Sequence, residues 1–420
     1  MELNQSNSRL SILFAVLLGV SIPALAFGRV VFAATLGLAV FALLASQIRQ
    51  PAWRFFLGQL GTPVAICISV TLALWLVSAM GSSFVARSAE ASLRSVLFIV
   101  FGVLVTGALR AVPPLAKVSL SALTIAAAIS VGFAVVASTA LPELYWLLRL
   151  HGPKSTPLKT EFKSFSALAV MLVPLLLWYA WRWRGILALV AMAGAATMLY
   201  MVSKTHNRAA LAGFVGAALA FGVALLARRA TKRNFILFAA GFASVVAGVI
   251  IWLKTSRYHM VAQAPAGDWA FPIWLVDFQR QTIWTYVLKI FESAPWFGIG
   301  ANSINFAPGA DLPMPGNEKL HIIPAHPHNW LMEILAETGA IGLTAMLVAV
   351  AAATLAIMQK YRRTGAAGYL VAAVIFGGYW VSGLFNFSYW SAWWQVAFVL
   401  AVAMAVADPR PSPVGTRSAA

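Results

Sequence analysis

The stretch HPHNWLMEILAETG, residues 326–339, marks the point at which the chain changes character. It closes a polar segment, residues 254–327, and opens an apolar helix. Nearly everything outside that segment is apolar, so a polar loop is held against an apolar body. The histidines at this junction are candidates for chemistry, because an imidazole titrates near neutral pH.

The apolar body has the composition of a helical membrane protein. Of the 420 residues, 61% are hydrophobic and 10% are charged, and the mean hydropathy is +0.83. A helix needs about 20 mostly apolar residues to cross a bilayer, and runs of this kind recur along the whole chain. They predict an all-α polytopic membrane protein with twelve transmembrane helices, at residues 10–27, 30–48, 62–80, 93–109, 118–141, 165–181, 185–203, 209–227, 235–253, 340–358, 365–385 and 389–407.

The predicted spans divide the chain into four parts. Residues 1–253 hold helices 1–9, residues 254–327 form one large loop between helices 9 and 10, residues 328–407 hold helices 10–12, and residues 408–420 form a tail. Within the large loop, the apolar spacing i, i+3, i+4, i+7 predicts an amphipathic helix from Trp274 to Ser293. The proline-rich remainder predicts an irregular but ordered connection.

The formal net charge of +18 reports orientation in the membrane rather than binding of nucleic acid, because the basic residues are scattered between apolar spans. Placing both termini in the cytoplasm gives the inside segments sixteen of the 30 basic residues and two acids, Glu2 and Asp408. The positive-inside rule therefore predicts cytoplasmic termini and puts the large loop on the outer side.

Three residues on that outer side are candidates for a site. His328 lies near the start of a predicted helix, since Pro327 suits a first helical turn, and it can either accept a proton from a hydroxyl or simply cap the helix. Arg208 belongs to a polar cluster with Lys204 and His206 at the outer ends of two spans. An arginine there either binds an anionic substrate or reaches lipid phosphates.

Arg280 is the third candidate, because it shares the apolar stripe of the loop helix with Trp284. A guanidinium on a buried face needs an anion or other acceptors, and Asp277, three residues earlier, is the structural alternative to a substrate. Two guanidiniums can clamp a pyrophosphate while a histidine acts as base. Glu333 and Glu337 lie about 140° and 180° around the helix from His328, so neither can orient it.

A metal site is disfavoured. His321, His326 and His328 lie close in sequence to Asp311 and Glu318, but His-x-His across a proline without an HExxH helix is a poor zinc signature. The chain also lacks an Asp-x-Asp pair, a P-loop and a Gly-x-Ser-x-Gly turn. The prediction is a site without metal or cofactor.

The residues around His328 resemble those of a known family. His328-Asn329, nine residues, Gly339, two residues and Gly342 are similar to the His-Asn-x9-Gly-x-x-Gly pattern of the bacterial O-antigen ligases. That family shares a superfamily with O-antigen polymerases. An Arg-x-x-x-x-Trp helix leading into a Pro-Trp-Phe-Gly-x-Gly turn, and an Asn-Arg-Ala element opening the eighth span, agree with the resemblance, which covers roughly residues 201–347.

The resemblance implies a site at the periplasmic face of the inner membrane. His328 matches the family's essential histidine, and Arg208 and Arg280 match the arginines that hold a lipid-linked pyrophosphate. The donor is then an O-antigen glycan on undecaprenyl pyrophosphate, and the acceptor is lipid A-core oligosaccharide. His326, Asn329, Lys204 and His206 are added as substrate-binding residues, with no metal and no cofactor.

Two other functions stay open at this point. An O-antigen polymerase, which joins lipid-linked repeat units, uses the same chemistry but tends to have two sizeable periplasmic loops, whereas the second outer loop here, residues 142–164, is short. A lipid-linked oligosaccharide transporter would need charged residues in the middle of spans, and almost none occur.

Overall fold

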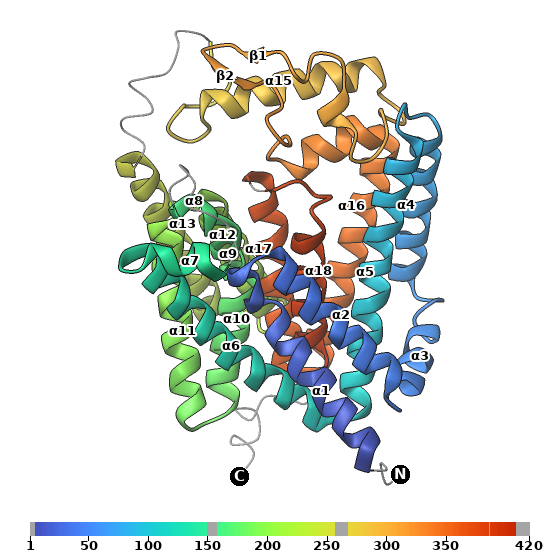
Figure 1. Ribbon diagram of the computed structural model, residues 1–420, viewed down its shortest axis with the longest axis vertical. Helices are drawn as coiled ribbons and strands as arrows, with labels where there is room; N and C mark the ends of the chain where they lie inside the picture. The colour runs from blue at the N-terminus through green and yellow to red at the C-terminus, as the bar shows by residue number, and fades with distance from the viewer. Residues whose placement is uncertain (1–4, 149–157, 257–267, 386, 409–420) are drawn as a thin grey trace.

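The computed structural model describes residues 5–148, 158–256, 268–385 and 387–408, and most of this chain is α-helical (Figure 1). The long helices stand together as a bundle. In chain order the elements are α1 (Gln5–Ser21), η1 (Pro23–Phe27), α2 (Arg29–Ala45), α3 (Arg49–Leu57), α4 (Pro63–Met80), α5 (Val85–Ala111), α6 (Pro113–Thr139), α7 (Pro142–Leu148), α8 (Leu158–Glu161), α9 (Lys163–Ala167), α10 (Ala169–Arg182), α11 (Ile186–Lys204), α12 (Arg208–Arg228), α13 (Lys232–Ser256), α15 (Phe278–Ser293), η2 (Ile304–Phe306), β1 (Pro313–Met314), β2 (Asn317–His321), α16 (Trp330–Thr364), α17 (Ala367–Ser382), η3 (Gly383–Phe385) and α18 (Ala392–Val406).

The helices have the lengths and compositions of membrane spans. Within the described residues, eight helices are long and apolar enough to cross a bilayer, and the α2–α3 pair, bent by 92°, is a ninth if counted as one span. Helices α1, α10 and α18 are apolar but shorter. The prediction of an all-α polytopic membrane protein is confirmed. The number twelve stays a prediction, and residues 409–420 of the predicted tail lie outside the described chain.

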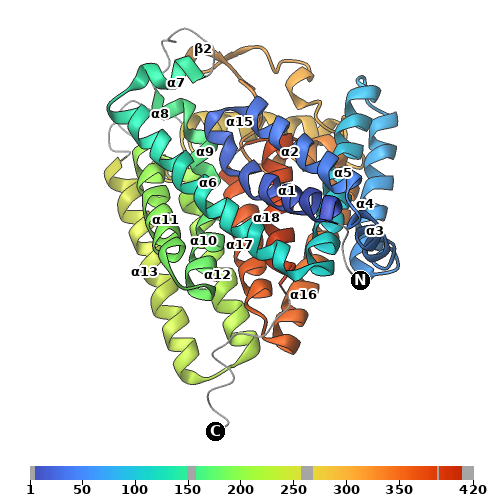
Figure 2. The same ribbon diagram turned by 60° about the horizontal axis from the view of Figure 1, so that its bottom comes forward.

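Small residues let the helices approach closely. Helices α1 and α6 lie side by side (Figures 1 and 2), and a Cβ at Gly19 would lie 2.1 Å from the Ser119 carbonyl oxygen. A Cβ at Gly216 in α12 would lie 2.4 Å from the Gly377 carbonyl oxygen in α17. Close contact between backbones is the usual basis of helix association in lipid, where burial of apolar surface gives little advantage.

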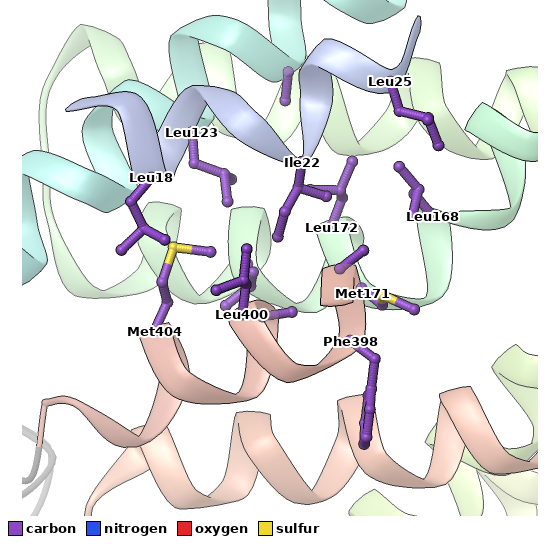
Figure 3. Packing of buried hydrophobic residues seen from close by; sticks show 14 of the residues in the cluster. Leu18, Ile22, Leu25, Leu123, Leu168, Met171, Leu172, Phe398, Leu400 and Met404 are labelled. Atoms are coloured by element: carbon purple, nitrogen blue, oxygen red, sulfur yellow. The ribbon is translucent and has the colours of Figure 1, made fainter. Parts of the chain in front are cut away.

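The centre of the bundle is packed with aliphatic side chains. Figure 3 shows Leu18 of α1, Ile22 directly after that helix, Leu172 of α10 and Leu400 of α18 packed close together, and all four are buried. These interdigitated side chains hold the bundle together through many small dispersion contacts. The body is therefore a fixed frame on which polar groups at its ends can be positioned.

Loops predicted to face the cytoplasm meet at the end of the bundle away from α15 (Figure 1). Arg182 pairs with Asp408 at 3.7 Å, joining the α10–α11 connection to the end of α18. Arg228 Nη1 donates to the Gly365 carbonyl oxygen at 3.3 Å, joining the α12–α13 and α16–α17 connections. This grouping agrees with placing these connections on one side of the membrane, and which side is cytoplasmic remains a prediction.

Two predicted helix starts are corrected. Helix α15 begins at Phe278 rather than at Trp274, because Asp277 is extended and caps the helix. Helix α16 begins at Trp330 rather than in a turn opened by Pro327, because Asn329 is the N-cap. Its Oδ1 accepts hydrogen bonds from Leu331 N and Met332 N.

The proline-rich connection before α16 is more regular than predicted. Strands β1 and β2 pair antiparallel, with Pro313 opposite His321 and Met314 opposite Asn317. Together with α15 this hairpin lies across the end of the bundle that carries the site described below (Figure 1).

Helix α16 is broken at Gly339, which has φ 68° and ψ −179°. This left-handed conformation favours glycine. The Pro-Trp-Phe-Gly-x-Gly turn bonds to the backbone at the break: Ala340 N donates to the Pro295 carbonyl oxygen at 2.8 Å, and Gly300 N donates to the Glu337 carbonyl oxygen at 2.8 Å. Two elements of the sequence pattern are thus one structural unit, which fixes the outer segment of α16.

Replacing Gly339 by alanine is expected to destabilise the protein by about 1–3 kcal/mol or more, because the backbone would be strained and the new Cβ would lie 2.2 Å from the Trp296 carbonyl oxygen. Thermal unfolding in detergent measures this. Gly132→Ala in α6 is the matched control, since its Cβ would meet nothing within 4 Å. Equal unfolding temperatures for the two variants would contradict the assigned role of the break.

Candidate active site

Arg208 and Arg280 meet at a single carboxylate oxygen. Arg208 Nη1 donates to Asp277 Oδ2 at 3.0 Å, and Arg280 Nη1 donates to the same oxygen at 2.9 Å. The Asp277 side chain is 5% exposed, whereas those of Arg208 and Arg280 are 24% and 15% exposed. The structural pairing of Arg280 with Asp277 is therefore present, but the same carboxylate also brings in Arg208 from α12.

The starts of two helices position these arginines. Arg208 is the first residue of α12, whose N-cap Asn207 accepts from Ala210 N at 3.1 Å. Arg280 lies in the first turn of α15, whose N-cap Asp277 accepts from Arg280 N through Oδ1 at 2.9 Å. Helix N-termini carry partial positive charge, so both helices add to the attraction of the guanidiniums for an anion.

Arg280 is held from two sides. Besides its bond to Asp277, its Nη2 donates to the Phe385 carbonyl oxygen at 3.3 Å. Its Nε is buried and finds no hydrogen-bond acceptor in the described chain. Burial and, to a smaller extent, the charge of Arg208 lower the pKa of Arg280 to about 10 despite the attraction of Asp277. A second anion beside these arginines would therefore be stabilised by them.

Lys163 is a further cation at this place, and we did not predict it as a site residue. Asn207 Nδ2 donates to the Lys163 carbonyl oxygen at 2.9 Å, which fixes the start of α9 beside Arg208. Although its side chain reaches solvent, partial desolvation lowers the pKa of Lys163, and the charges of Arg208 and Arg280 lower it further. Its one sequence signal is its position at the outer end of a predicted span.

His328 lies beside α15. It has φ 56° and directly precedes the N-cap Asn329, so its conformation is left-handed rather than helical. Trp284 Nε1 donates to the Pro327 carbonyl oxygen at 3.0 Å, which ties the backbone before His328 to the helix that carries Arg280. The rings of His326 and His328 lie against each other with centroids 4.1 Å apart and planes tilted by 54°, and both residues are half-buried.

Phe385 and Phe387 connect the histidine segment to the arginines. The Phe385 carbonyl oxygen accepts from Arg280, and the Phe387 ring lies 6.2 Å from the ring of His326. The connection between α17 and α18 thus touches both groups. Arg208, Arg280 and His328, which were predicted to act together, are therefore linked through the residues that they contact at one end of the bundle.

The two glutamates of α16 bond to the backbone and to Trp390, and so hold the outer segment in place. Glu337 accepts from Asn302 N and Ile304 N, both at 2.8 Å, and from Trp390 Nε1. Glu333 accepts from Tyr389 N at 2.6 Å. Both carboxylates are buried.

Lys204 and His206 lie at the edge of the site. Lys204 Nζ is 5.5 Å from the centroid of the Tyr200 ring, and the His206 ring is 5.9 Å from the ring of Trp252. Both side chains are exposed. They belong to the polar end of α11 but stand apart from the arginine–carboxylate contact.

A metal centre finds no ligand set in the chain that the structure describes, where no group of three or more His, Cys, Asp and Glu side chains could hold an ion. The cations available to offset a negative charge in the site are side chains: Arg208, Arg280 and Lys163, with Asp277 as the one carboxylate that the two arginines share.

The fold and this site define a polytopic membrane protein with two arginines joined by one carboxylate at one end of its bundle. Residues 193–347, which include Arg208, Arg280 and His328, match the family model described as O-antigen ligase. The predicted resemblance to the O-antigen ligase family is thereby confirmed over this region.

Several curated proteins are similar to this chain. A Rickettsia typhi protein named "Putative polysaccharide ligase" is 27% identical over 206 residues, which cover 47% of this chain and 46% of that protein. Relatives of the same kind from Rickettsia conorii and Rickettsia prowazekii are 25% and 27% identical, with the same coverage. The chain thus matches less than half the length of these relatives.

Proposed function

We propose that this protein is an O-antigen ligase of the bacterial inner membrane. It transfers an O-antigen glycan from undecaprenyl pyrophosphate to a sugar hydroxyl of lipid A-core, at the periplasmic face, in lipopolysaccharide biosynthesis. The observation that carries the proposal is the meeting of Arg208 and Arg280 at one oxygen of Asp277, beside Lys163. A site that already holds two guanidiniums around an anionic oxygen suits a diphosphate.

The charges support this donor. Arg208, Arg280 and a protonated Lys163, set against Asp277, leave two positive charges. A pyrophosphate esterified at both ends carries one negative charge on each phosphate. Guanidiniums bind phosphate oxygens through paired N–H groups, and such charge-assisted bonds are among the strongest in proteins. The donor can therefore be neutralised by the chain's own side chains.

The reaction is a single displacement. The acceptor hydroxyl oxygen attacks C1 of the first sugar, the bond between C1 and the pyrophosphate oxygen breaks, and undecaprenyl pyrophosphate leaves. Arg208 and Arg280 stabilise the negative charge that builds on that oxygen. His328 takes the proton of the attacking hydroxyl. Attack opposite the leaving group inverts the anomeric centre, and no metal takes part.

The remaining predicted residues have supporting roles in this proposal. The ring of His326 contacts that of His328 and limits its movement. Asn329 uses its side-chain oxygen to cap α16, so it positions His328 rather than holding substrate through that oxygen. Lys204 and His206, exposed at the end of α11, are placed to meet a glycan or lipid headgroups. The twelve spans and the outward orientation of the 254–327 loop belong to the same proposal.

A deletion strain distinguishes an O-antigen ligase from an O-antigen polymerase. A strain without the ligase is expected to accumulate long O-antigen polymer on the lipid carrier and to show uncapped lipopolysaccharide on a gel. Loss of a polymerase leaves lipopolysaccharide capped by a single repeat unit. That second pattern would refute the ligase and favour the polymerase.

A further inference from the structure

We propose that Asp277 is a positioning residue of the donor site: it holds Arg208 and Arg280 side by side while no donor is bound, and it releases Arg208 to the donor's pyrophosphate. The inference rests on the proposed function, because the pyrophosphate replaces a contact that the protein makes with itself. Asp277 is assigned no role in catalysis other than through the two arginines.

The two oxygens of the Asp277 carboxylate accept hydrogen bonds from different groups. Oδ1 accepts from the backbone N–H of Arg280 and so belongs to the start of α15. Oδ2 accepts one N–H from each arginine, at 2.9 and 3.0 Å. A guanidinium has five N–H groups, so each arginine keeps N–H groups that are not bonded to Asp277. Without the shared oxygen, two like charges at this distance would repel each other.

The segment before Asp277 is braced, so the carboxylate is held in place. Gln281, one turn into α15 and 5% exposed, donates through Nε2 to the carbonyl oxygens of Phe271 at 2.8 Å and Val276 at 3.0 Å. Its Oε1 accepts from Phe271 N at 2.9 Å. A buried amide with its hydrogen bonds satisfied fixes the chain that leads into the cap. The arginines are thus arranged around a rigid point.

The two arginines differ in how firmly they are attached. Arg280 is bound to Asp277 through both backbone and side chain and also reaches the Phe385 carbonyl oxygen. Among the described residues, the Arg208 guanidinium donates a hydrogen bond to Asp277 alone. The Arg208 side chain is also more exposed than that of Arg280. Arg208 is therefore the arginine that exchanges the carboxylate for phosphate oxygens.

The test replaces Asp277 by asparagine in the purified, full-length protein. Asparagine is an equally good N-cap, so the start of α15 is retained while the charge is lost. With a lipid-linked glycan donor and a lipid A-core acceptor, kcat/KM for the donor is expected to fall about 10- to 100-fold, the range for one charge-assisted hydrogen bond. The donor KM carries most of the loss, and the acceptor KM is unchanged.

Two comparisons isolate the effect. Asp311→Asn removes the same charge from an exposed position in the same outer segment and is expected to leave kinetics unchanged. In a double-mutant cycle of Asp277→Asn with Arg208→Lys, the combined loss is expected to be clearly smaller than the product of the two single losses, because both changes remove one contact. If Asp277→Asn does not fold, Asp277→Glu keeps the charge but displaces it, and a raised donor KM is expected for it.

The outcomes are distinguishable. An unchanged donor KM in Asp277→Asn, or fully multiplicative losses in the cycle, would overturn the positioning role while leaving the ligase proposal intact. Absence of transfer by the wild-type protein under the same conditions would count against the proposed function itself.

Discussion

Replacing His328 by alanine is expected to reduce glycan transfer by about 10²–10⁴-fold, the usual contribution of a positioned general base. The acceptor hydroxyl would have to lose its proton to water, while the donor would still bind to the arginines. Donor KM should therefore change little and kcat should fall. In cells, the O-antigen ladder on a lipopolysaccharide gel should disappear although the protein is present in the membrane.

His321→Ala is the matched control for this experiment. His321 belongs to β2 in the same outer segment, is exposed, and contacts the Asp311 carbonyl oxygen through Nδ1 at 2.5 Å. Its replacement removes an imidazole without touching the proposed site, so the ladder should be normal. A normal ladder in His328→Ala as well would remove the catalytic role of His328.

Replacing Arg280 by lysine is expected to lower kcat/KM for the donor by about 10²–10³-fold, as loss of a preorganised charge donor does in other enzymes. One ammonium cannot reproduce the planar fork that bonds Asp277 and the Phe385 carbonyl oxygen together. Burial already lowers the pKa of Arg280 to about 10. Burial lowers the pKa of a lysine too, so residual activity of this variant should decline as pH rises and the ammonium loses its proton.

Arg208→Lys should be impaired less than Arg280→Lys, because Arg208 is more exposed and has fewer fixed contacts. Arg87→Lys serves as the control: Arg87 is exposed at the α4–α5 end, where its Nε donates to the Asn302 carbonyl oxygen at 2.8 Å. Its replacement should leave transfer unchanged. Full activity in both site variants would show that paired guanidinium contacts are not needed.

The fold class could be predicted from sequence because hydropathy alone identifies apolar helices. Each predicted span overlaps one or more helices of the structure. Predicted boundaries were wrong where two local preferences competed. Pro327 favours a first helical turn, but Asn329 is the stronger N-cap and moved the start of α16 to Trp330, leaving His328 with a left-handed φ.

The candidate site could be predicted in part. The apolar stripe indicated Arg280, and the spacing of three residues indicated its partner Asp277, which the structure places at the N-cap of α15 rather than inside the helix. That Arg208 shares the same oxygen could not be predicted, since α12 and α15 are brought together only by the tertiary fold. For the same reason Lys163, placed by a hydrogen bond from Asn207, gave no local signal beyond its position at a span end.

The most direct measurement is reconstitution of the purified protein with an undecaprenyl-pyrophosphate-linked glycan and a lipid A-core acceptor, with and without a metal chelator. We expect glycan to appear on the acceptor at the same rate in both samples, and we expect His328→Ala and Arg280→Lys to fail in both. No transfer by the wild-type protein, or transfer that the chelator abolishes, would contradict a reaction carried by two guanidiniums and one imidazole.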